Sequence, residues 1–188
     1  MEKDAIFAAL SLSVTAAVLL LLTGGVDACD GAPSMSAADA CQQATAGPLY
    51  QLCANTLGPS GDAQEVTGFV AAAARAASQL YVATKDAVGK VVADPAAAED
   101  LKAACRTCLD RHDQAESLLA GVLDHLRGCA LADLRTDCAT AAAAIDECAT
   151  AVLPVGGHTP LYSLILLGRD RSVLALRLAI LLVPNKIN

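Results

Sequence analysis

The residues of this chain with the most reactive side chains are eight cysteines and three histidines. Cys105, Cys108 and His112 follow one another at spacings of three and four residues, which places them on one face of a helix. Such a set has the ligand types of a zinc site, and a C-x-x-C pair also serves in thiol oxidoreductases. However, all three residues lie on the apolar seam of the helix, no strand precedes them, and no fourth ligand is evident. We therefore expect no metal, redox centre or other cofactor, and we interpret His112 as a core histidine.

The N-terminal segment determines which chemistry the cysteines undergo. Residues 5–22 form an apolar run that is followed by Val26-Asp27-Ala28. Small residues at these positions are typical of a secretory signal peptide, here residues 1–28, although the run also approaches the length of a membrane anchor. Removal after Ala28 predicts a secreted, extracellular protein of residues 29–188 without a membrane segment. An even number of cysteines in such a protein favours disulfides.

The charge of the predicted mature chain excludes one large class of partners. Without residues 1–28 the chain keeps 12 basic and 17 acidic side chains, which gives a net charge of −5. A protein without a basic cluster and without tryptophan lacks the surface that nucleic acids require. The sequence also has no G-x-S-x-G motif and no paired carboxylates on a cleft-forming element, so we do not expect an enzyme. Five acids are interpreted as solvent-exposed helix positions: Asp110, Asp113, Glu116, Asp146 and Glu147.

Composition and periodicity predict an all-α fold, in which an N-terminal helical hairpin precedes an up-and-down four-helix bundle over residues 62–183. Apolar or small residues recur at alternating steps of four and three along three segments, and these positions are expected to face inward. They are Val66, Val70, Ala73, Ala77, Leu80, Thr84, Ala87 and Val91 in the first segment; Leu101, Cys105, Cys108, His112, Ala115, Leu119, Val122 and Leu126 in the second; and Leu134, Cys138, Ala141, Ile145, Cys148 and Val152 in the third.

Local signals place the ends of these helices. The first is expected to begin at a capping box of Asp62 and Glu65, and the second at Asp94-Pro95. The third is expected to end at the breakers Pro154, Gly156 and Gly157, and a fourth to cover about 170–183.

The register of the bundle predicts one disulfide. If the second and third bundle helices turn at residues 127–130, positions whose numbers sum to about 257 face each other. Cys108 and Cys148 then meet on the inward seam at one height, within reach of a bridge. Cys105 lies one turn away, where it either pairs with Cys29 or stays reduced. The register assigns no partners to the remaining two cysteines, Cys129 and Cys138.

A second disulfide is expected in the hairpin, residues 37–57. The segment begins with a Ser36-x-x-Asp39 cap signal and is interrupted at Gly47-Pro48. Each arm is too short to be stable as an isolated helix. A bridge from Cys41 to Cys53 would hold the arms together and contribute about 3 kcal/mol on the chain-entropy account.

A disulfide-closed hairpin followed by a four-helix bundle with one bridge resembles the plant pectin methylesterase and invertase inhibitor family. Four stretches carry the resemblance. Tyr50, Cys53 and Leu57 are similar to the family's Y-P-x-x-C-x-x-x-L, although Pro48 precedes the tyrosine. Ala104, Cys108 and Ala115 match A-L-x-x-C-L-x-x-Y-x-x-A, with His112 in the tyrosine slot. "DLRTDCATAAAAIDEC" is similar to D-V/L-x-T-W-L-S-A-A-L-T-x-x-x-T-C at Asp133, Leu134, Thr136, Ala141 and Cys148, and "SLILLGRDRSVLALRLAILL" is similar to the family's ending.

The resemblance implies an extracellular inhibitor, without chemistry of its own, that docks its bundle over the active-site cleft of a cell-wall carbohydrate enzyme. Invertase inhibitors of the family present a Pro-Lys-Phe motif between the second and third bundle helices. That loop here reads Arg127-Gly128-Cys129-Ala130-Leu131, so we favour pectin methylesterase over acid invertase as the protein partner. The expected target-binding face consists of Arg135, Thr136, Asp137 and Thr140, and the alternative face lies on the first bundle helix around Arg75, Gln79 and Asp86.

Two other functional classes fit the sequence less well than inhibition. Secreted lipid-transfer proteins are helical and have eight cysteines, but they are shorter and contain an adjacent Cys-Cys pair and a C-x-C pair that this chain lacks. A glycolipid-anchored or structural wall protein would use the C-terminal apolar run as its anchor signal. Arg177 interrupts that run and a polar tail follows it, which favours a buried bundle helix.

Non-reducing peptide mapping tests the predicted pairs. Peptides that link Cys41 to Cys53 and Cys108 to Cys148 are expected. A Cys108–Cys138 peptide would contradict the register, because Cys138 then faces Leu119, roughly three helical turns from Cys108 at about 1.5 Å per residue.

Overall fold

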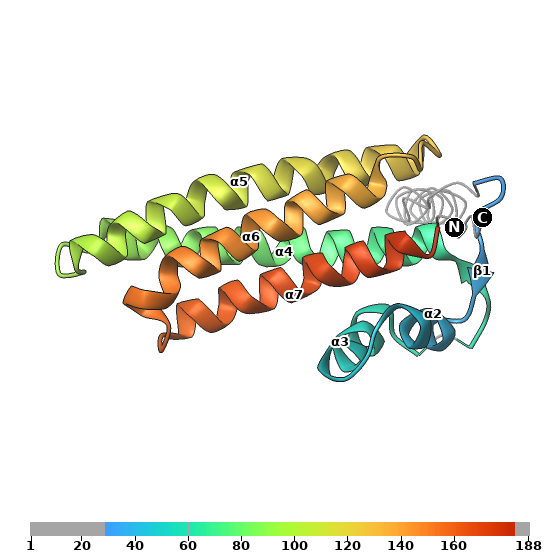
Figure 1. The fold of residues 1–188 in the computed structure, drawn as a ribbon, viewed down its shortest axis with the longest axis horizontal. Coiled ribbons are helices and arrows are strands. Elements are labelled where there is room, and N and C mark those ends of the chain that lie inside the picture. Colours follow the sequence, from blue (N-terminus) through green and yellow to red (C-terminus); the bar gives the residue numbers. More distant parts are fainter. Residues whose placement is uncertain (1–28, 60, 183–188) are drawn as a thin grey trace, which may run out of the picture.

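A computed structural model describes residues 29–59 and 61–182 of the chain. The predicted signal peptide, residues 1–28, lies outside the described residues. In chain order the elements are β1 Ser34–Met35, α2 Ala37–Ala44, α3 Pro48–Leu57, β2 Gln64–Glu65, α4 Val66–Ala93, α5 Glu99–Arg127, α6 Leu134–Gly156 and α7 Pro160–Ile180. Figure 1 shows the four long helices side by side, with the hairpin α2–α3 beside one end of the bundle.

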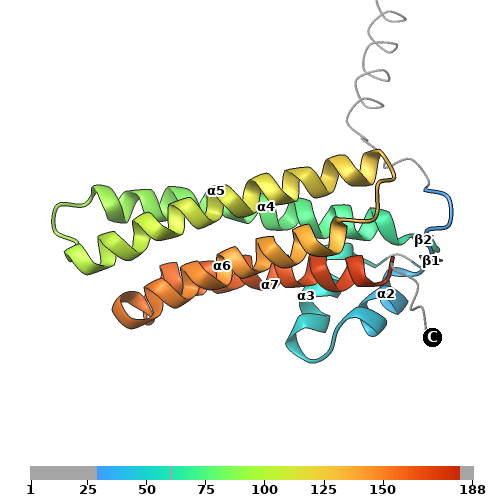
Figure 2. The same cartoon turned by 45° about the horizontal axis from the view of Figure 1, so that its top comes forward.

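The long helices form an up-and-down bundle, which confirms the predicted all-α architecture. Each helix packs against its neighbour in the chain, and α7 also packs against α4, so that the four close around one core. Figure 2 shows the same order from a second direction. Short connections between consecutive helices make neighbours antiparallel.

The inward positions follow the predicted seams in α5 and α6 and depart from them in α4. Every expected position of α6 is buried. In α5 all expected positions are buried except Leu101, and the adjacent Lys102 is buried instead. In α4, Tyr81 and Val88 are buried, whereas the expected Leu80 is half-buried. A straight helix of 3.6 residues per turn drifts from a repeat of 3.5, which moves the later contacts of α4 by one residue.

Some of the predicted helix boundaries are confirmed and others are wrong. Ser36 caps α2 as predicted: its Oγ accepts a hydrogen bond from the Asp39 N–H at 3.1 Å and donates one to the Asp39 carboxylate at 2.6 Å. Asp94 does not begin α5. It ends α4, and its carboxylate accepts a hydrogen bond from the Ala96 N–H at 2.8 Å. The capping box at Asp62 is also wrong, because α4 begins after Glu65 without a side-chain cap.

The C-terminal half of the bundle also differs from expectation. Helix α7 begins at Pro160, ten residues before the predicted start, and Thr159 caps it by accepting a hydrogen bond from the Tyr162 N–H at 3.3 Å. Helix α6 continues through Pro154 and ends at Gly156, among the breakers that the sequence indicated. A proline fits at the first position of a helix, where no N–H is needed, so Pro160 can begin α7.

Three disulfides connect these elements. Cys41–Cys53 joins the two hairpin helices, and Cys108–Cys148 joins α5 to α6 with its Cα atoms 4.5 Å apart. These are the two pairs expected from the sequence. The third, Cys29–Cys129, links the start of the described chain to the loop between α5 and α6. It closes a loop of sequence separation 100 and contributes about 4.7 kcal/mol on the chain-entropy account. Two thiols remain, Cys105 and Cys138, both buried.

The hairpin is attached mainly to α4 and α7. Helix α3 packs on both of them, and α2 packs on α7. The sequence did not predict the short antiparallel pair β1–β2, in which Ser34 is opposite Glu65. This pair joins the segment before the hairpin to the residue that precedes α4.

One buried hydrogen bond ties α4 to α7 through the core. Tyr81 and Ser172 are both fully buried, and their side-chain oxygens are hydrogen-bonded to each other. The Ser172 hydroxyl donates its own hydrogen to the Gly168 carbonyl at 2.8 Å, so the Tyr81 hydroxyl must be the donor to Ser172. Burial raises the pKa of Tyr81 to about 12.

Removing this hydrogen bond should lower the stability of the fold. We expect Tyr81→Phe to cost about 1 kcal/mol, or about 2–4 °C in Tm, because it removes the donor but leaves Ser172 bonded to Gly168. Above pH 10 the unfolded chain loses a tyrosyl proton that the folded protein keeps until about pH 12, so the parent loses stability over this window and the variant loses less. Denaturant melts at several pH values measure both effects. Tyr50→Phe, at a half-buried site in the hairpin, is the control and should change stability by less than about 0.5 kcal/mol.

Candidate protein-binding surface

The first two turns of α6 present three of the four residues expected to bind a target. Arg135, Thr136 and Thr140 are exposed. The Thr140 hydroxyl donates a hydrogen bond to the Thr136 carbonyl at 2.8 Å, which fixes its rotamer against the helix. Asp137 is different, because it is half-buried and its carboxylate lies 3.4 Å from Nδ1 of His125 on α5. The structure therefore places three of these side chains on the surface and turns the fourth toward α5.

The orientation of this surface is set from the opposite side of the helix. Cys138, Ala141, Ile145 and Cys148 are buried, and the Cys108–Cys148 bridge fixes the rotation of α6 against α5. By length and composition alone α6 is also apolar enough to cross a membrane, but here its apolar side packs against α5 and α7. Over the first three turns its exposed residues are Arg135, Thr136, Thr140 and Ala143.

The acids farther along the bundle form ion pairs between helices. The Glu147 carboxylate of α6 pairs with the Arg111 guanidinium of α5 at 2.8 Å, and the Asp146 carboxylate lies 3.6 Å from the Arg169 guanidinium of α7. Lys85 of α4 binds two acids of α5, Asp113 at 2.9 Å and Glu116. All four acids are exposed or nearly so, as expected, but they also face a basic partner across a helix junction. Exposed pairs of this kind contribute little stability each, and they leave fewer free charges for a partner.

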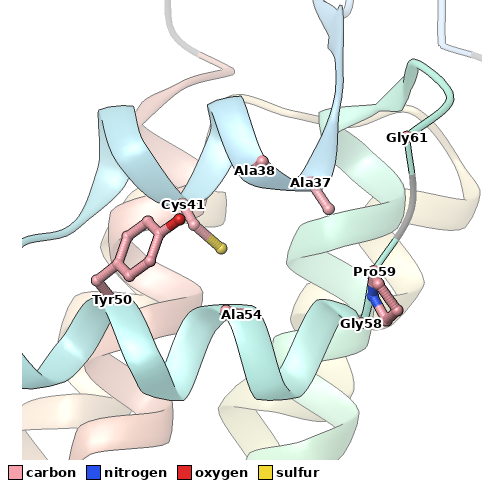
Figure 3. Close-up of a pocket in the computed structure, with 8 residues that line it drawn as sticks. All are labelled: Ala37, Ala38, Cys41, Tyr50, Ala54, Gly58, Pro59 and Gly61. Atoms are coloured by element: carbon pink, nitrogen blue, oxygen red, sulfur yellow. The ribbon is translucent and has the colours of Figure 1, made fainter.

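A cleft between the two hairpin helices is a second candidate surface. Its volume is about 390 Å³, and it is lined by Ala37, Ala38, Cys41, Tyr50, Ala54, Gly58, Pro59 and Gly61. Figure 3 shows Tyr50 at one end and Pro59 at the other, with Ala37 and Ala38 of α2 across from Ala54 of α3. Five of the eight lining residues are alanine or glycine, so the helices leave space between them, while the Cys41–Cys53 bridge holds the two Cα atoms 5.6 Å apart. The alanines and the Gly58-Pro59 step were the available sequence signal for this cleft.

The set formed by Cys105, Cys108 and His112 serves packing. The Cys108 sulfur is bonded to Cys148 and is not a free thiolate. Burial raises the pKa of the Cys105 thiol, which makes it a poor nucleophile. Within residues 29–59 and 61–182, no group of three or more histidine, cysteine or acidic side chains is placed to hold a metal ion.

His112 is fully buried, which confirms its interpretation as a core histidine. Its Nδ1 lies 2.8 Å from the Cys108 carbonyl, so Nδ1 carries the hydrogen, and its ring meets Tyr81 edge-to-face with centroids 5.3 Å apart. Its Nε2 has no hydrogen-bond partner among the described residues. Burial is the main cause that lowers the pKa of His112, and Lys85 adds to the effect. The bond to Cys108 opposes it.

No protein-family model matches the chain, and a search of curated proteins finds no match. The described residues form two candidate surfaces, the exposed side of α6 and the small apolar cleft of the hairpin.

The buried imidazole should make stability sensitive to mild acid. As the pH falls below about 6.5, His112 becomes protonated in the unfolded chain but stays neutral in the folded protein, because its pKa is lowered there. The stability of the parent therefore decreases. We expect His112→Phe, which keeps an aromatic ring against Tyr81, to reduce this slope. Tm measured from pH 7.5 to 4.5 tests the difference between variant and parent. His158→Phe, at an exposed loop position, is the matched control and should keep the parental slope.

Proposed function

We propose that this protein is a secreted proteinaceous inhibitor of a plant cell-wall carbohydrate-active enzyme, with pectin methylesterase as its target. The observation that carries the proposal is the arrangement of the disulfides. Cys41–Cys53 closes a helical hairpin, and Cys108–Cys148 bridges the second and third helices of a four-helix bundle. This is the combination that the family resemblance implies, and it occurs together with the motifs around Cys53, Cys108 and Cys148.

The proposed mechanism is steric and needs no reaction on the inhibitor. The bundle lays the exposed side of α6 over the substrate cleft of the enzyme and prevents the polysaccharide from entering. Thr136 and Thr140 supply short side chains with hydroxyl groups on a helix that two neighbours and one disulfide hold in place. A surface ordered before binding loses little conformational entropy in the complex, which favours affinity.

Two observations favour pectin methylesterase over acid invertase. The loop between α5 and α6 lacks a Pro-Lys-Phe motif, and the Cys29–Cys129 bridge pins it to the start of the chain. The net charge of −5 for residues 29–188 also suits a basic enzyme, because opposite net charges accelerate association. Inhibition of acid invertase remains the alternative function.

Parallel inhibition assays with a basic pectin methylesterase and an acid invertase test the proposal. We expect the mature protein to inhibit the methylesterase, with an association rate that falls as salt is raised. Replacing Thr136 and Thr140 by lysine should weaken inhibition by about 2 kcal/mol, or roughly thirtyfold in Kd, because two charged side chains would enter the centre of the contact. Tm should stay unchanged, since both positions are exposed.

The matched control is Gln79→Lys, an exposed position on α4. It should inhibit as the parent does. Loss of inhibition in the control but not in the α6 double variant would move the contact to α4, near Arg75 and Asp86. Inhibition of invertase alone would replace the proposed target, and inhibition of neither enzyme would refute an inhibitory function for these two targets.

A further inference from the structure

The backbone nitrogen of Cys29 lies against both oxygens of one carboxylate. It is 2.9 Å from Oε1 and 3.2 Å from Oε2 of Glu65. A peptide nitrogen carries one hydrogen and directs it well at only one acceptor. An ammonium group carries three hydrogens and a positive charge. The geometry therefore suits an α-amino terminus better than an internal amide.

Cys29 and Glu65 are each held in place by further contacts besides the one between them. Cys29 is buried, its sulfur is bonded to Cys129, and its carbonyl accepts a hydrogen bond from the Ala32 N–H at 3.0 Å. Glu65 is half-buried, its backbone pairs with Ser34 in the strand pair β1–β2, and its Oε2 accepts the Thr67 hydroxyl at 3.1 Å. The site is thus preorganised, and its position does not depend on the charge of the nitrogen.

We propose that Glu65 is the binding site for the mature N-terminus, and that proteolytic processing between Ala28 and Cys29 creates its ligand. A signal-peptidase-type hydrolase adds water across the Ala28–Cys29 peptide bond. Ala28 leaves with the new carboxylate, and Cys29 keeps the nitrogen as a primary amine. The amine takes up a proton at neutral pH, because α-amino groups ordinarily titrate near 7.7–8.0. This proposal rests on the predicted signal peptide and is independent of the inhibitory function.

Processing then strengthens a contact that joins three parts of the fold. Before cleavage the Glu65 carboxylate faces a neutral amide. After cleavage it faces an ammonium ion, and charge-assisted hydrogen bonds are shorter and stronger than neutral ones. Glu65 directly precedes α4, and Cys29 is bonded to the loop between α5 and α6, so the ion pair ties the start of α4 to that loop. The mature protein should therefore be more stable than a chain that extends beyond Cys29.

A four-protein comparison tests this. The chain is secreted from a eukaryotic host in its natural form and, separately, with a Ser-Gly-Ala extension that remains attached to Cys29, and each form is made with Glu65 and with Glu65→Gln. We expect intact mass to place the natural N-terminus at Cys29. The Tm of the mature protein should exceed that of the extended protein by about 2–4 °C with Glu65, and the two should agree within error with Glu65→Gln.

Asp30→Asn is the matched control, because it removes an equal charge from an exposed residue adjacent to Cys29. It should keep the difference between mature and extended forms. If Glu65→Gln does not yield folded protein, Glu65→Asp replaces it, since the shorter side chain keeps the charge but withdraws it from the nitrogen. An equal Tm for the mature and extended parents, an equal shift in both Glu65 backgrounds, or a natural N-terminus at another residue would each overturn the proposal.

Discussion

The close antiparallel contact of α5 with α6 is the constraint on which the rest of the bundle depends. At Cys108 and Cys148 the Cα atoms are 4.5 Å apart, a distance that excludes large side chains between the two backbones. The surrounding seam is accordingly built from small residues, Ala115, Ala141 and Ala144 among them. This contact fixes the height and rotation of α6, and with them which threonines reach solvent. It also determines the groove against which α4 and α7 pack.

The core between the four helices also contains polar side chains, and the close packing leaves no room for water around them. Tyr81, His112 and Ser172 are all fully buried and come from three different helices. Each has at least one hydrogen-bond partner, and His112 keeps one nitrogen without a partner among the described residues. Of these bonds only Tyr81–Ser172 crosses between helices, because His112 and Ser172 bond to carbonyls of their own helices. A rotation of α4 or α7 would leave the buried Tyr81 hydroxyl without its acceptor, which favours the observed arrangement over others that bury the same apolar area.

The sequence predicted the parts of the fold in which one side of a helix differs clearly from the other. In α5 charged residues separate the apolar positions, and in α6 the larger apolar residues and the cysteines recur at steps of three and four, so the seam and the Cys108–Cys148 pair followed from counting. In α4, Leu80 and Tyr81 are both apolar and adjacent, and periodicity alone does not choose between them. The exposure of Thr136 and Thr140 was predictable for the same reason. The contact of Asp137 with His125 and the site at Glu65 bring together different segments of the chain, which the pattern within one helix does not place relative to each other. The hairpin cleft depends on how closely α2 packs against α3, and its alanines and glycines indicate this only in part.

The three disulfides differ in how much chain must exist before each can close. Their cysteines are 12, 40 and 100 residues apart. During synthesis from the N-terminus, Cys41 meets Cys53 almost at once, while Cys29 must wait until Cys129 has emerged and must meanwhile avoid both hairpin cysteines. Early closure of the hairpin removes those two competitors. The order of the pairs along the chain thus removes two competitors of the longest covalent loop. Cys105, Cys138 and Cys108, whose partner Cys148 emerges after Cys129, remain competitors until the bundle forms.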